Sequence, residues 1–209
     1  PTSALAHSSA EAARAAGSLD WVAARCRRDE LAPGGFGQQI YAAADAGEIS
    51  EETAATLVRT FLGGGVDTTV LSLGALVHLL ATHPGQWRLL RERRDLVRNA
   101  FDEGLRLCPS VPIVGRTTTA ATKLGGVSLD AEEKIFCLIL AANRDPRRWE
   151  RGDEFDIERR TAGQLGFGVG PHFCVGHAVA RLEAEVVLDA LLDRVGTIAK
   201  DDGVHHAAQ

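Results

Sequence analysis

The residues best suited to chemistry lie in a glycine-rich loop near the end of the chain, residues 167–176. Glycine lets a backbone approach a large flat ligand closely and adopt positive φ values. Within this loop, Cys174 stands just before a stretch that we expect to be helical. Backbone N–H groups and the positive end of a helix dipole favour a thiolate over a thiol at such a place. The loop could therefore hold a thiolate ligand beside a flat cofactor.

Three other interpretations of this loop compete with a thiolate site. A cysteine is often only a buried structural residue. A glycine-rich loop can also bind phosphate, but here no strand precedes it and neither G-x-G-x-x-G nor G-K-[ST] is present. A cysteine hydrolase that pairs Cys174 with His172 is unfavourable, because the two residues are two positions apart in a loop without an orienting acid.

A second pair of chemical groups, Glu103 and Arg106, is three residues apart and so lies on one face of a predicted helix. On a helix surface such an ion pair is common and contributes only about 0.2 to 0.5 kcal/mol to stability. The pair alone is therefore weak support for a functional site.

A third motif consists of three consecutive glycines, residues 63–65, followed by Asp67 and Thr68. Three glycines inside a helix cost about 1 kcal/mol each relative to alanine. The pattern therefore indicates a kink, a tight helix crossing, or a place where a ligand comes close to the helix.

The elements that must position these motifs are mainly helical, with a small β part. Ser50 offers an N-cap oxygen and two glutamates follow it, so a helix is expected to begin at residue 51 and to continue until Pro84 stops it. This helix would be about 48 Å long. Its middle is apolar on all sides, so we expect it to run through a protein interior.

The remaining elements follow from periodicity and from the positions of glycine and proline. The expected helices span residues 10–29, 38–46, 51–82, 87–94, 96–107 and 177–195, and the expected strands span 111–119, 122–124, 127–129 and 135–140. We treat the chain as a single domain fragment made of a helical lead-in (1–49), the long central helix (50–82), the helical region of Glu103 and Arg106 (84–108), a β part (111–142), and the cysteine loop with the final helix (163–195).

Composition excludes several classes of protein. With 209 residues, 45% of them hydrophobic and 24% charged, the chain is neither disordered nor fibrous. Its net charge of −5 supplies no field for nucleic acid or an anionic membrane. The longest apolar run, residues 135–142, is far shorter than the roughly 20 residues needed to cross a bilayer. Four widely spaced cysteines without a C-x-x-C favour a reducing compartment.

In combination, the motifs resemble the cytochrome P450 family, the haem-thiolate monooxygenases. The cysteine loop matches the haem-binding signature of the family at Phe167, Gly168, Gly170, His172, Cys174 and Gly176. By this resemblance Cys174 is the axial thiolate ligand of the iron of haem b, and His172 binds a haem propionate. Arg116 occupies the strand position whose arginine pairs with a propionate in the family.

The resemblance also gives the other two motifs a role. Glu103 and Arg106 match the family's buried structural pair, which is often completed by a later arginine. Here Arg151, Arg159 and Arg160 are all candidates for that third partner. Asp67 and Thr68 match the acid and threonine of the central helix that guide protons to oxygen over the haem. A threonine hydroxyl at residue 68 could bond the carbonyl oxygen four residues earlier and open the helix locally.

The resemblance implies a bacterial-type monooxygenase fold of which this chain, from about residue 10 to residue 195, is only the C-terminal half. Pro1 as the first residue and the lack of methionine also suggest a piece of something longer. The implied protein is cytoplasmic and takes electrons ultimately from NAD(P)H, through a ferredoxin or similar carrier. Its implied substrate is a small organic molecule, with a para-substituted aromatic acid as one candidate, suggested by residues 101–103 and 143–149.

Two alternatives stay open at the sequence level. The chain could be a haem-binding module without monooxygenase activity, either truncated or a peroxide-using relative. Separately, a cluster of arginines could dock an acidic electron carrier, although such a run is more often a solvated face. Its members are Arg88, Arg91, Arg93 and Arg94.

Overall fold

The computed structural model describes residues 17–199, with the side chains of residues 18 and 19 left out. The chain divides into two compact units, residues 1–66 and 67–209, and the boundary falls inside the long helix α4 (Glu51–Thr82). Each unit has its own small hydrophobic core. The treatment of the chain as one domain fragment stays a prediction.

The first unit is helical. It contains α2 (Ser18–Arg25), a 3₁₀ turn η1 (Arg28–Glu30), α3 (Phe36–Asp45) and the start of α4. Its core consists of Cys26, Tyr41, Ala54 and Val58. The Ser50 hydroxyl accepts the Thr53 backbone N–H at 3.1 Å, which confirms the predicted N-cap of α4.

The predicted helix over residues 10–29 is partly outside the described residues, and its described part ends earlier than expected. α2 ends at Arg25 because the chain bends toward α3 just after it. Arg28 forms an ion pair with Asp45 of α3, and its guanidinium carbon lies 5.6 Å from the ring centroid of Tyr41. These contacts between elements override the helix propensity of the arginine-rich segment.

α4 begins and ends where the sequence predicts, but the expectation that its middle runs through an interior is wrong in this structure. Near its C-terminal end Leu76, Leu79 and Leu80 are buried in the core of the second unit. Further toward the N-terminus Val70 and Leu71 are 64% and 60% exposed. Only one face of this part of the helix is packed, because the described elements of the second unit contact it from one side.

α4 is also the one helix among residues 17–199 that is long and apolar enough to cross a membrane by length and composition alone. The longest uninterrupted apolar run in the sequence does not reveal this, because small and polar residues interrupt the apolar ones. A core helix of a soluble protein meets the same criterion. The expectation of no membrane span therefore stays a prediction.

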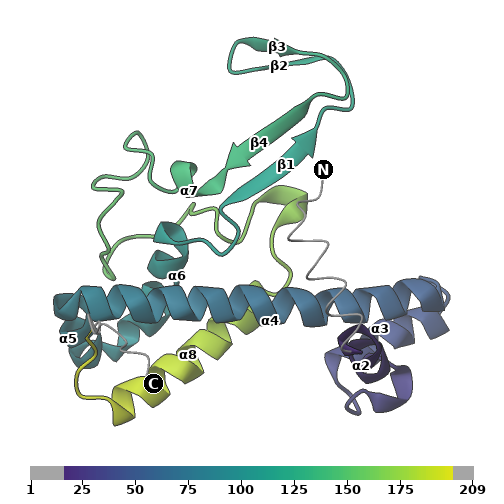
Figure 1. Ribbon diagram of the computed structural model, residues 1–209, viewed down its shortest axis with the longest axis horizontal. Helices are drawn as coiled ribbons and strands as arrows, with labels where there is room; N and C mark the ends of the chain where they lie inside the picture. The colour runs from purple at the N-terminus through teal and green to yellow at the C-terminus, as the bar shows by residue number, and fades with distance from the viewer. Residues whose placement is uncertain (1–16, 200–209) are drawn as a thin grey trace, which may run out of the picture. The chain divides into compact units, whose positions relative to one another are not determined.

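The second unit is built around α6 (Val97–Leu107), which packs against α8 (His177–Arg194), with α5 (Pro84–Glu92) and the short turn η2 (Arg94–Leu96) beside it. Figure 1 shows these helices at the C-terminal end of α4. A glycine in α6 permits close packing, since a Cβ at Gly104 would lie 3.1 Å from Cδ1 of Leu76. The core comprises Leu76, Leu79, Leu80, Trp87, Leu90, Val97, Ala100, Phe101, Leu105, Leu107, Phe155, Ile157, Phe167, Ala184, Leu188 and Leu192.

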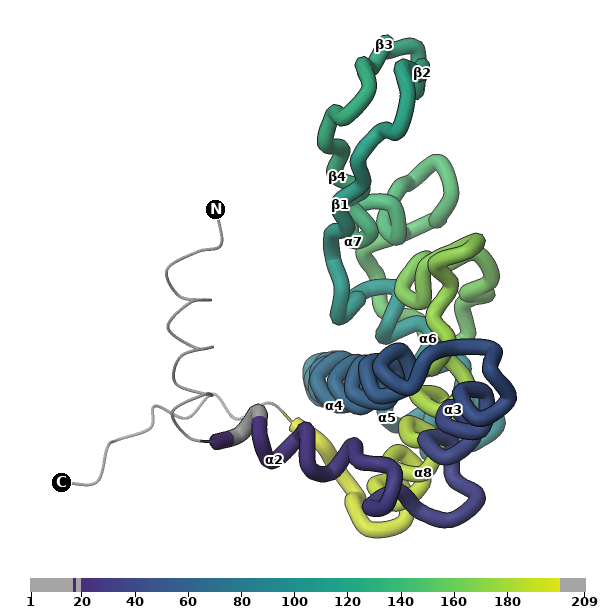
Figure 2. The backbone as a smooth tube through the Cα atoms, turned by 90° about the vertical axis from the view of Figure 1, so that its right-hand side faces the viewer, coloured from purple at the N-terminus to yellow at the C-terminus, as the bar shows by residue number. Residues whose placement is uncertain are grey.

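The β part consists of two antiparallel pairs. β1 (Ile113–Thr117) pairs with β4 (Lys134–Leu138), and β2 (Thr122–Leu124) pairs with β3 (Val127–Leu129). The second pair has the predicted bounds, because Gly125 and Gly126 at φ 56° and 88° make the two-residue turn. In Figures 1 and 2 this hairpin extends beyond the end of the β1–β4 pair and away from the helices of the second unit.

The predicted strand over residues 135–140 is wrong at its end. β4 stops at Leu138 and the chain turns into a short helix, α7 (Ile139–Ala142). This turn brings the carbonyl oxygen of Asn143 to Nη1 of Arg106, 2.6 Å away in α6. The residues after α7 are irregular until the 3₁₀ turn η3 (Gly170–His172), which leads into α8.

Candidate functional site

A backbone hydrogen bond closes the cysteine loop. The N–H of Cys174 donates to the carbonyl oxygen of Phe167 at 2.7 Å. Gly168 lies at φ 72°, and a Cβ there would come within 2.8 Å of the carbonyl oxygen of His172. Only glycine fits this position, because both the positive φ and the close approach exclude a side chain. The loop thus presents Cys174 in a fixed place immediately before α8.

The sulfur of Cys174 lies at the N-terminal end of α8. A Cβ added to Gly176, the residue before the helix, would lie 3.8 Å from Sγ. α8 is 18 residues long, and the N-terminus of such a helix carries a partial positive charge. The backbone N–H of His177 donates to the Cys174 carbonyl oxygen at 3.3 Å, which fixes the cysteine against the first turn.

The residues around Cys174 fit an iron that arrives inside a flat apolar ligand. Cys174 is half-buried, and three apolar residues of the same loop, Val169, Phe173 and Val175, are 68%, 47% and 68% exposed, so the loop offers apolar surface to such a ligand. Within residues 17–199, apart from side chains 18 and 19, no three His, Cys, Asp or Glu residues are grouped so that they could hold a bare metal ion. A single thiolate suits a metal whose remaining ligands come from a macrocycle such as haem.

Glu103 and Arg106 form a fully buried pair in α6. Both side chains are 0% exposed, and the guanidinium meets the carboxylate twice, with Nε to Oε2 at 2.7 Å and Nη2 to Oε1 at 2.9 Å. Arg106 also donates to the carbonyl oxygens of Asn143 at 2.6 Å, Gly152 at 2.8 Å and Glu154 at 3.2 Å. All five guanidinium N–H groups therefore have an acceptor.

Among the candidates for the third partner of this pair, the structure selects Arg159. Its Nε lies 3.0 Å from Oε1 of Glu103, and its side chain is only 10% exposed. Arg151 instead pairs at the surface with Glu154. Glu103, Arg106 and Arg159 therefore form a buried triad. The spacing of Glu103 and Arg106 in the sequence does not show that the group is buried or that it has a third member.

Asn143 links this triad to the cysteine loop. Its side chain is fully buried, and its Oδ1 accepts the backbone N–H of Leu165 at 2.8 Å, just before the loop begins. Its carbonyl oxygen accepts Arg106, as described above. The sequence alone does not reveal this linking role, because it depends on contacts between segments far apart in the chain.

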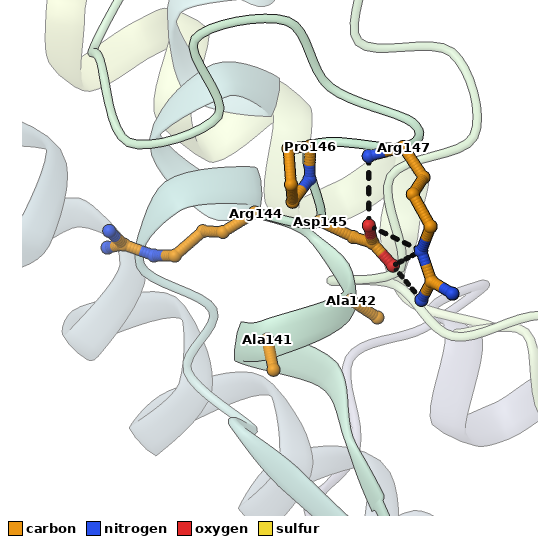
Figure 3. Close-up of a pocket in the computed structure, with 6 residues that line it drawn as sticks. All are labelled: Ala141, Ala142, Arg144, Asp145, Pro146 and Arg147. Carbon is orange, nitrogen blue, oxygen red and sulfur yellow. Dashed lines mark hydrogen bonds and ion pairs between the residues drawn. The ribbon is translucent and has the colours of Figure 1, made fainter.

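The residues after Asn143 form a charged turn. In Figure 3 the carboxylate of Asp145 faces Arg147, while the side chain of Arg144 points the other way. Asp145 accepts the guanidinium Nε of Arg147 at 2.9 Å and the backbone N–H of the same residue at 2.9 Å. These bonds, the side-chain one first, lower the pKa of Asp145 to about 2. Arg144 donates to the carbonyl oxygen of Leu107 at 2.8 Å and so ties the turn to the end of α6.

Asp67 and Thr68 lie on α4, in the second unit. Asp67 is exposed and Thr68 is half-buried, while the next residue, Thr69, is buried. A Cβ at any of the three preceding glycines would meet nothing within 4 Å among the described neighbours, and α4 is unbroken there. The structure thus shows no tight helix crossing at these glycines, and the role of Asp67 and Thr68 stays a prediction.

Arg116 and His172 are both exposed. Arg116 lies on β1 and donates through Nη1 to the carbonyl oxygen of Gly115 at 2.8 Å. His172 lies in η3, two residues before Cys174. Both side chains can reach an anionic group at the surface, and their assignment to haem propionates stays a prediction.

The arginine cluster in and after α5 is mostly paired within the chain. Nη1 of Arg91 donates to the carbonyl oxygen of Gly196 at 2.7 Å. Arg93 and Arg94 form ion pairs with Asp95 at 2.8 Å and with Asp193 at 2.7 Å. These contacts favour the interpretation of the cluster as a structural and solvated face.

Comparison with known sequences decides the family. A sequence model of cytochrome P450 matches residues 36–195, which is most of the chain. The chain belongs to the cytochrome P450 family. It is 48% identical to cytochrome P450 CYP199A2 of Rhodopseudomonas palustris over 88% of this chain and 45% of that protein. It is 35% identical to the erythromycin C-12 hydroxylase of Saccharopolyspora erythraea over 87% of this chain and 47% of that protein.

Solved P450 structures confirm the fold, which is mainly α with a small β part and is here incomplete. Cytochrome P450 CREJ in complex with (4-ethylphenyl) dihydrogen phosphate superposes with a TM-score of 0.71 at 33% identity, over 74% of this chain and 39% of that one. The chain therefore spans about half the length of the P450 relatives that it matches. The P450 cofactor is haem iron, which agrees with the chemistry of the cysteine loop.

Proposed function

We propose that the protein is a haem-thiolate monooxygenase. It inserts one atom of O₂ into a small organic substrate and reduces the other to water, using two electrons and two protons. The observation that supports this most strongly is Cys174, held at the N-terminus of α8 by a closed glycine loop that also exposes apolar side chains. The cofactor would be haem b, whose iron supplies the oxygen chemistry that protein side chains lack.

Each site residue then has a defined task. Cys174 would bind the iron, and the bound haem would supply the O₂ chemistry, which a thiolate ligand favours. Phe167, Gly168 and Gly176 give the loop the shape that would hold the cofactor. Arg116 and His172 bind the propionates through charge-assisted hydrogen bonds. Glu103 and Arg106 are structural and hold the segments that carry the loop.

Asp67 and Thr68 would deliver protons from α4. A solvent-excluded site must bring protons through fixed groups rather than through bulk water. The exposed Asp67 carboxylate can exchange protons with solvent, and the half-buried Thr68 hydroxyl can pass a proton inward. The division of the pair between surface and interior is what a relay requires.

The partners follow from this chemistry. Electrons would come ultimately from NAD(P)H through a ferredoxin or a similar carrier, and the protein would work in the bacterial cytoplasm. The proposed substrate class is a small para-substituted aromatic acid. One supporting likeness is the CREJ structure, whose ligand is a para-substituted phenyl ring with an anionic group. No role for nucleic acid or a membrane is proposed.

The test is the carbon monoxide difference spectrum of the reduced complete protein that contains this chain. A thiolate-bound haem gives a strongly red-shifted Soret band, and a histidine-bound haem does not. The activity is then tested with reductase, ferredoxin, NAD(P)H and a panel of aromatic acids, and oxidised product is measured against cofactor consumed. A thiolate spectrum without product from any substrate would favour the alternative, a haem-binding module that lacks monooxygenase activity.

A further inference from the structure

An ion pair between Asp102 of α6 and Arg181 of α8 lies beside the cysteine loop. Nε of Arg181 is 2.9 Å from Oδ1 and 3.2 Å from Oδ2 of Asp102. Both side chains are only 16% exposed, which is much less than most ion pairs on this molecule. None of the three sequence motifs assigns a role to either residue.

Arg181 also contacts the aromatic ring at the start of the loop. Its guanidinium carbon lies 4.6 Å from the ring centroid of Phe167, within the range of a cation–π contact. Phe167 is buried, and its carbonyl oxygen accepts the N–H of Cys174. Arg181 thus contacts the ring of Phe167, and the backbone of Phe167 in turn accepts the hydrogen bond from Cys174. Together with Phe173, these side chains line one small cavity.

The charge of the pair bears on the metal site as well as on the shape of the loop. Asp102 cancels the positive charge that Arg181 brings next to Phe167. Reduction of a ferric haem adds one negative charge at the site that Cys174 ligates. An uncompensated cation nearby stabilises the reduced form and an uncompensated anion destabilises it, and partial burial makes both effects stronger than they would be in water.

We propose that Asp102 and Arg181 are positioning residues for the thiolate loop. Arg181 fixes Phe167 and, through it, the backbone of Cys174. Asp102 orients the guanidinium and neutralises it, so that the pair supports the loop without shifting the reduction potential of the iron. This inference rests on the proposed function, because it requires haem iron bound to Cys174.

The experiment is a reductive titration of the complete haem protein carrying each substitution. Asp102→Asn leaves the arginine charge uncompensated and should raise the potential, and Arg181→Gln leaves the aspartate uncompensated and should lower it. Each single change should alter the ferric–ferrous equilibrium constant by about two- to tenfold, where tenfold is 59 mV for one electron. The double variant should return close to the wild-type potential.

Arg181→Lys separates positioning from charge. Lysine keeps the positive charge but lacks the planar fork that meets a carboxylate and an aromatic ring together. This variant should keep the wild-type potential while its thiolate-type carbonyl spectrum decays several-fold faster to the non-thiolate form. It also remains informative if Arg181→Gln does not fold.

A matched control lies on the same two helices. Arg98 of α6 and Glu185 of α8 form a longer pair at 3.9 Å, with side chains 64% and 34% exposed. Arg98→Gln and Glu185→Gln make the same kinds of charge change away from Phe167. They should leave both the potential and the decay of the carbonyl spectrum unchanged.

Two sets of results would overturn the inference while leaving the proposed function intact. One is a thiolate spectrum in the wild type with potentials that move in the same direction in both single variants. The other is a pair of control variants that shift the potential as much as Asp102→Asn and Arg181→Gln do. A wild-type protein without a thiolate spectrum would instead refute the proposed function itself.

Discussion

Cys174 depends on its own loop for its position immediately before α8. Replacing it with histidine keeps a metal ligand but removes the thiolate. We expect Cys174→His in the complete protein to bind haem, to lose the red-shifted carbonyl band, and to lose oxygen insertion, because imidazole donates less charge to iron. Absorbance of the reduced carbonyl form measures this.

A matched control for that change is Cys137→Ser, because Cys137 is an exposed cysteine of β4. This variant should keep the thiolate spectrum unchanged. If Cys174→His kept the red-shifted carbonyl band while Cys137→Ser lost it, the assignment of Cys174 as the iron ligand would be wrong.

Glu103 forms ion pairs with two arginines, Arg106 and Arg159. Glu103→Ala strands two arginines, one of them fully buried, and should cost about 3 to 5 kcal/mol. That is a large part of the stability of an ordinary domain. We therefore expect little soluble haem protein, measured as the yield of the carbonyl spectrum per cell mass.

The surface arginine Arg151 provides the comparison for this prediction. Its side chain is 59% exposed and its ion pair with Glu154 lies at the surface, so Arg151→Ala should cost less than about 1 kcal/mol. Equal yields from Glu103→Ala and the wild type would mean that the buried triad is not needed for folding.

Arg116 and His172 are predicted to share the task of holding the propionates. Arg116→Leu and His172→Leu should each weaken haem binding by about 1.5 to 3 kcal/mol, because each removes a hydrogen bond to a charged group. The rate of haem transfer to apomyoglobin measures the loss. Arg147→Leu, at a side chain 89% exposed, should transfer haem at the wild-type rate.

At the scale of elements, local signals in the sequence predict the ends of α4 and of the β2–β3 hairpin. Ser50 caps the helix with its own hydroxyl, and two glycines make the turn of the hairpin. The ends of α2 and β4 are mispredicted for the opposite reason. They depend on Arg28 and Asn143, whose partners are 17 and 37 residues away in the chain.

The proton relay proposed for α4 is tested through its coupling of electrons to product. Thr68→Ala should go on consuming reduced cofactor while releasing hydrogen peroxide in place of most of the product, because the second proton then reaches the wrong oxygen. Asp67→Asn should slow cofactor consumption and product formation together. Simultaneous assays of cofactor, peroxide and product distinguish the two patterns.

Thr60→Ala serves as the control for the relay, since Thr60 lies on the same helix and its hydroxyl donates to the Thr56 carbonyl oxygen at 2.8 Å. It should keep the wild-type ratio of product to cofactor. An unchanged ratio in Thr68→Ala as well would reduce residues 63–68 to a glycine-rich stretch of helix without a catalytic role.

At the scale of the whole molecule, the two units differ greatly in the size of their cores. Among residues 17–199, four buried hydrophobic residues form the core of the first unit and sixteen form that of the second. We expect the backbone amides of α3 to exchange with deuterium at least tenfold faster than those of α6, because local opening needs less apolar surface to be exposed. Mass spectrometry of peptides from both helices measures this difference.

The candidate site could be recognised from sequence where its residues are close along the chain. The cysteine loop and the Glu103–Arg106 spacing are of this kind. The sequence offers Arg159 only as one of three candidates. It gives no sign of the ion pair between Asp102 and Arg181, because residues 79 positions apart leave no periodic pattern. The sequence also does not predict that one apolar face of α4 is exposed, because composition shows that a helix is apolar but not which elements cover it.

The guanidinium of Arg106 draws its acceptors from α6 itself and from carbonyl groups at residues 143, 152 and 154. These three carbonyl groups belong to a stretch without regular secondary structure, which has no hydrogen-bond ladder to set its path. By donating to all three carbonyl oxygens, the side chain of Arg106 fixes the path of this irregular stretch. The path of the segment leading to the cysteine therefore depends on α6, because that helix carries Arg106.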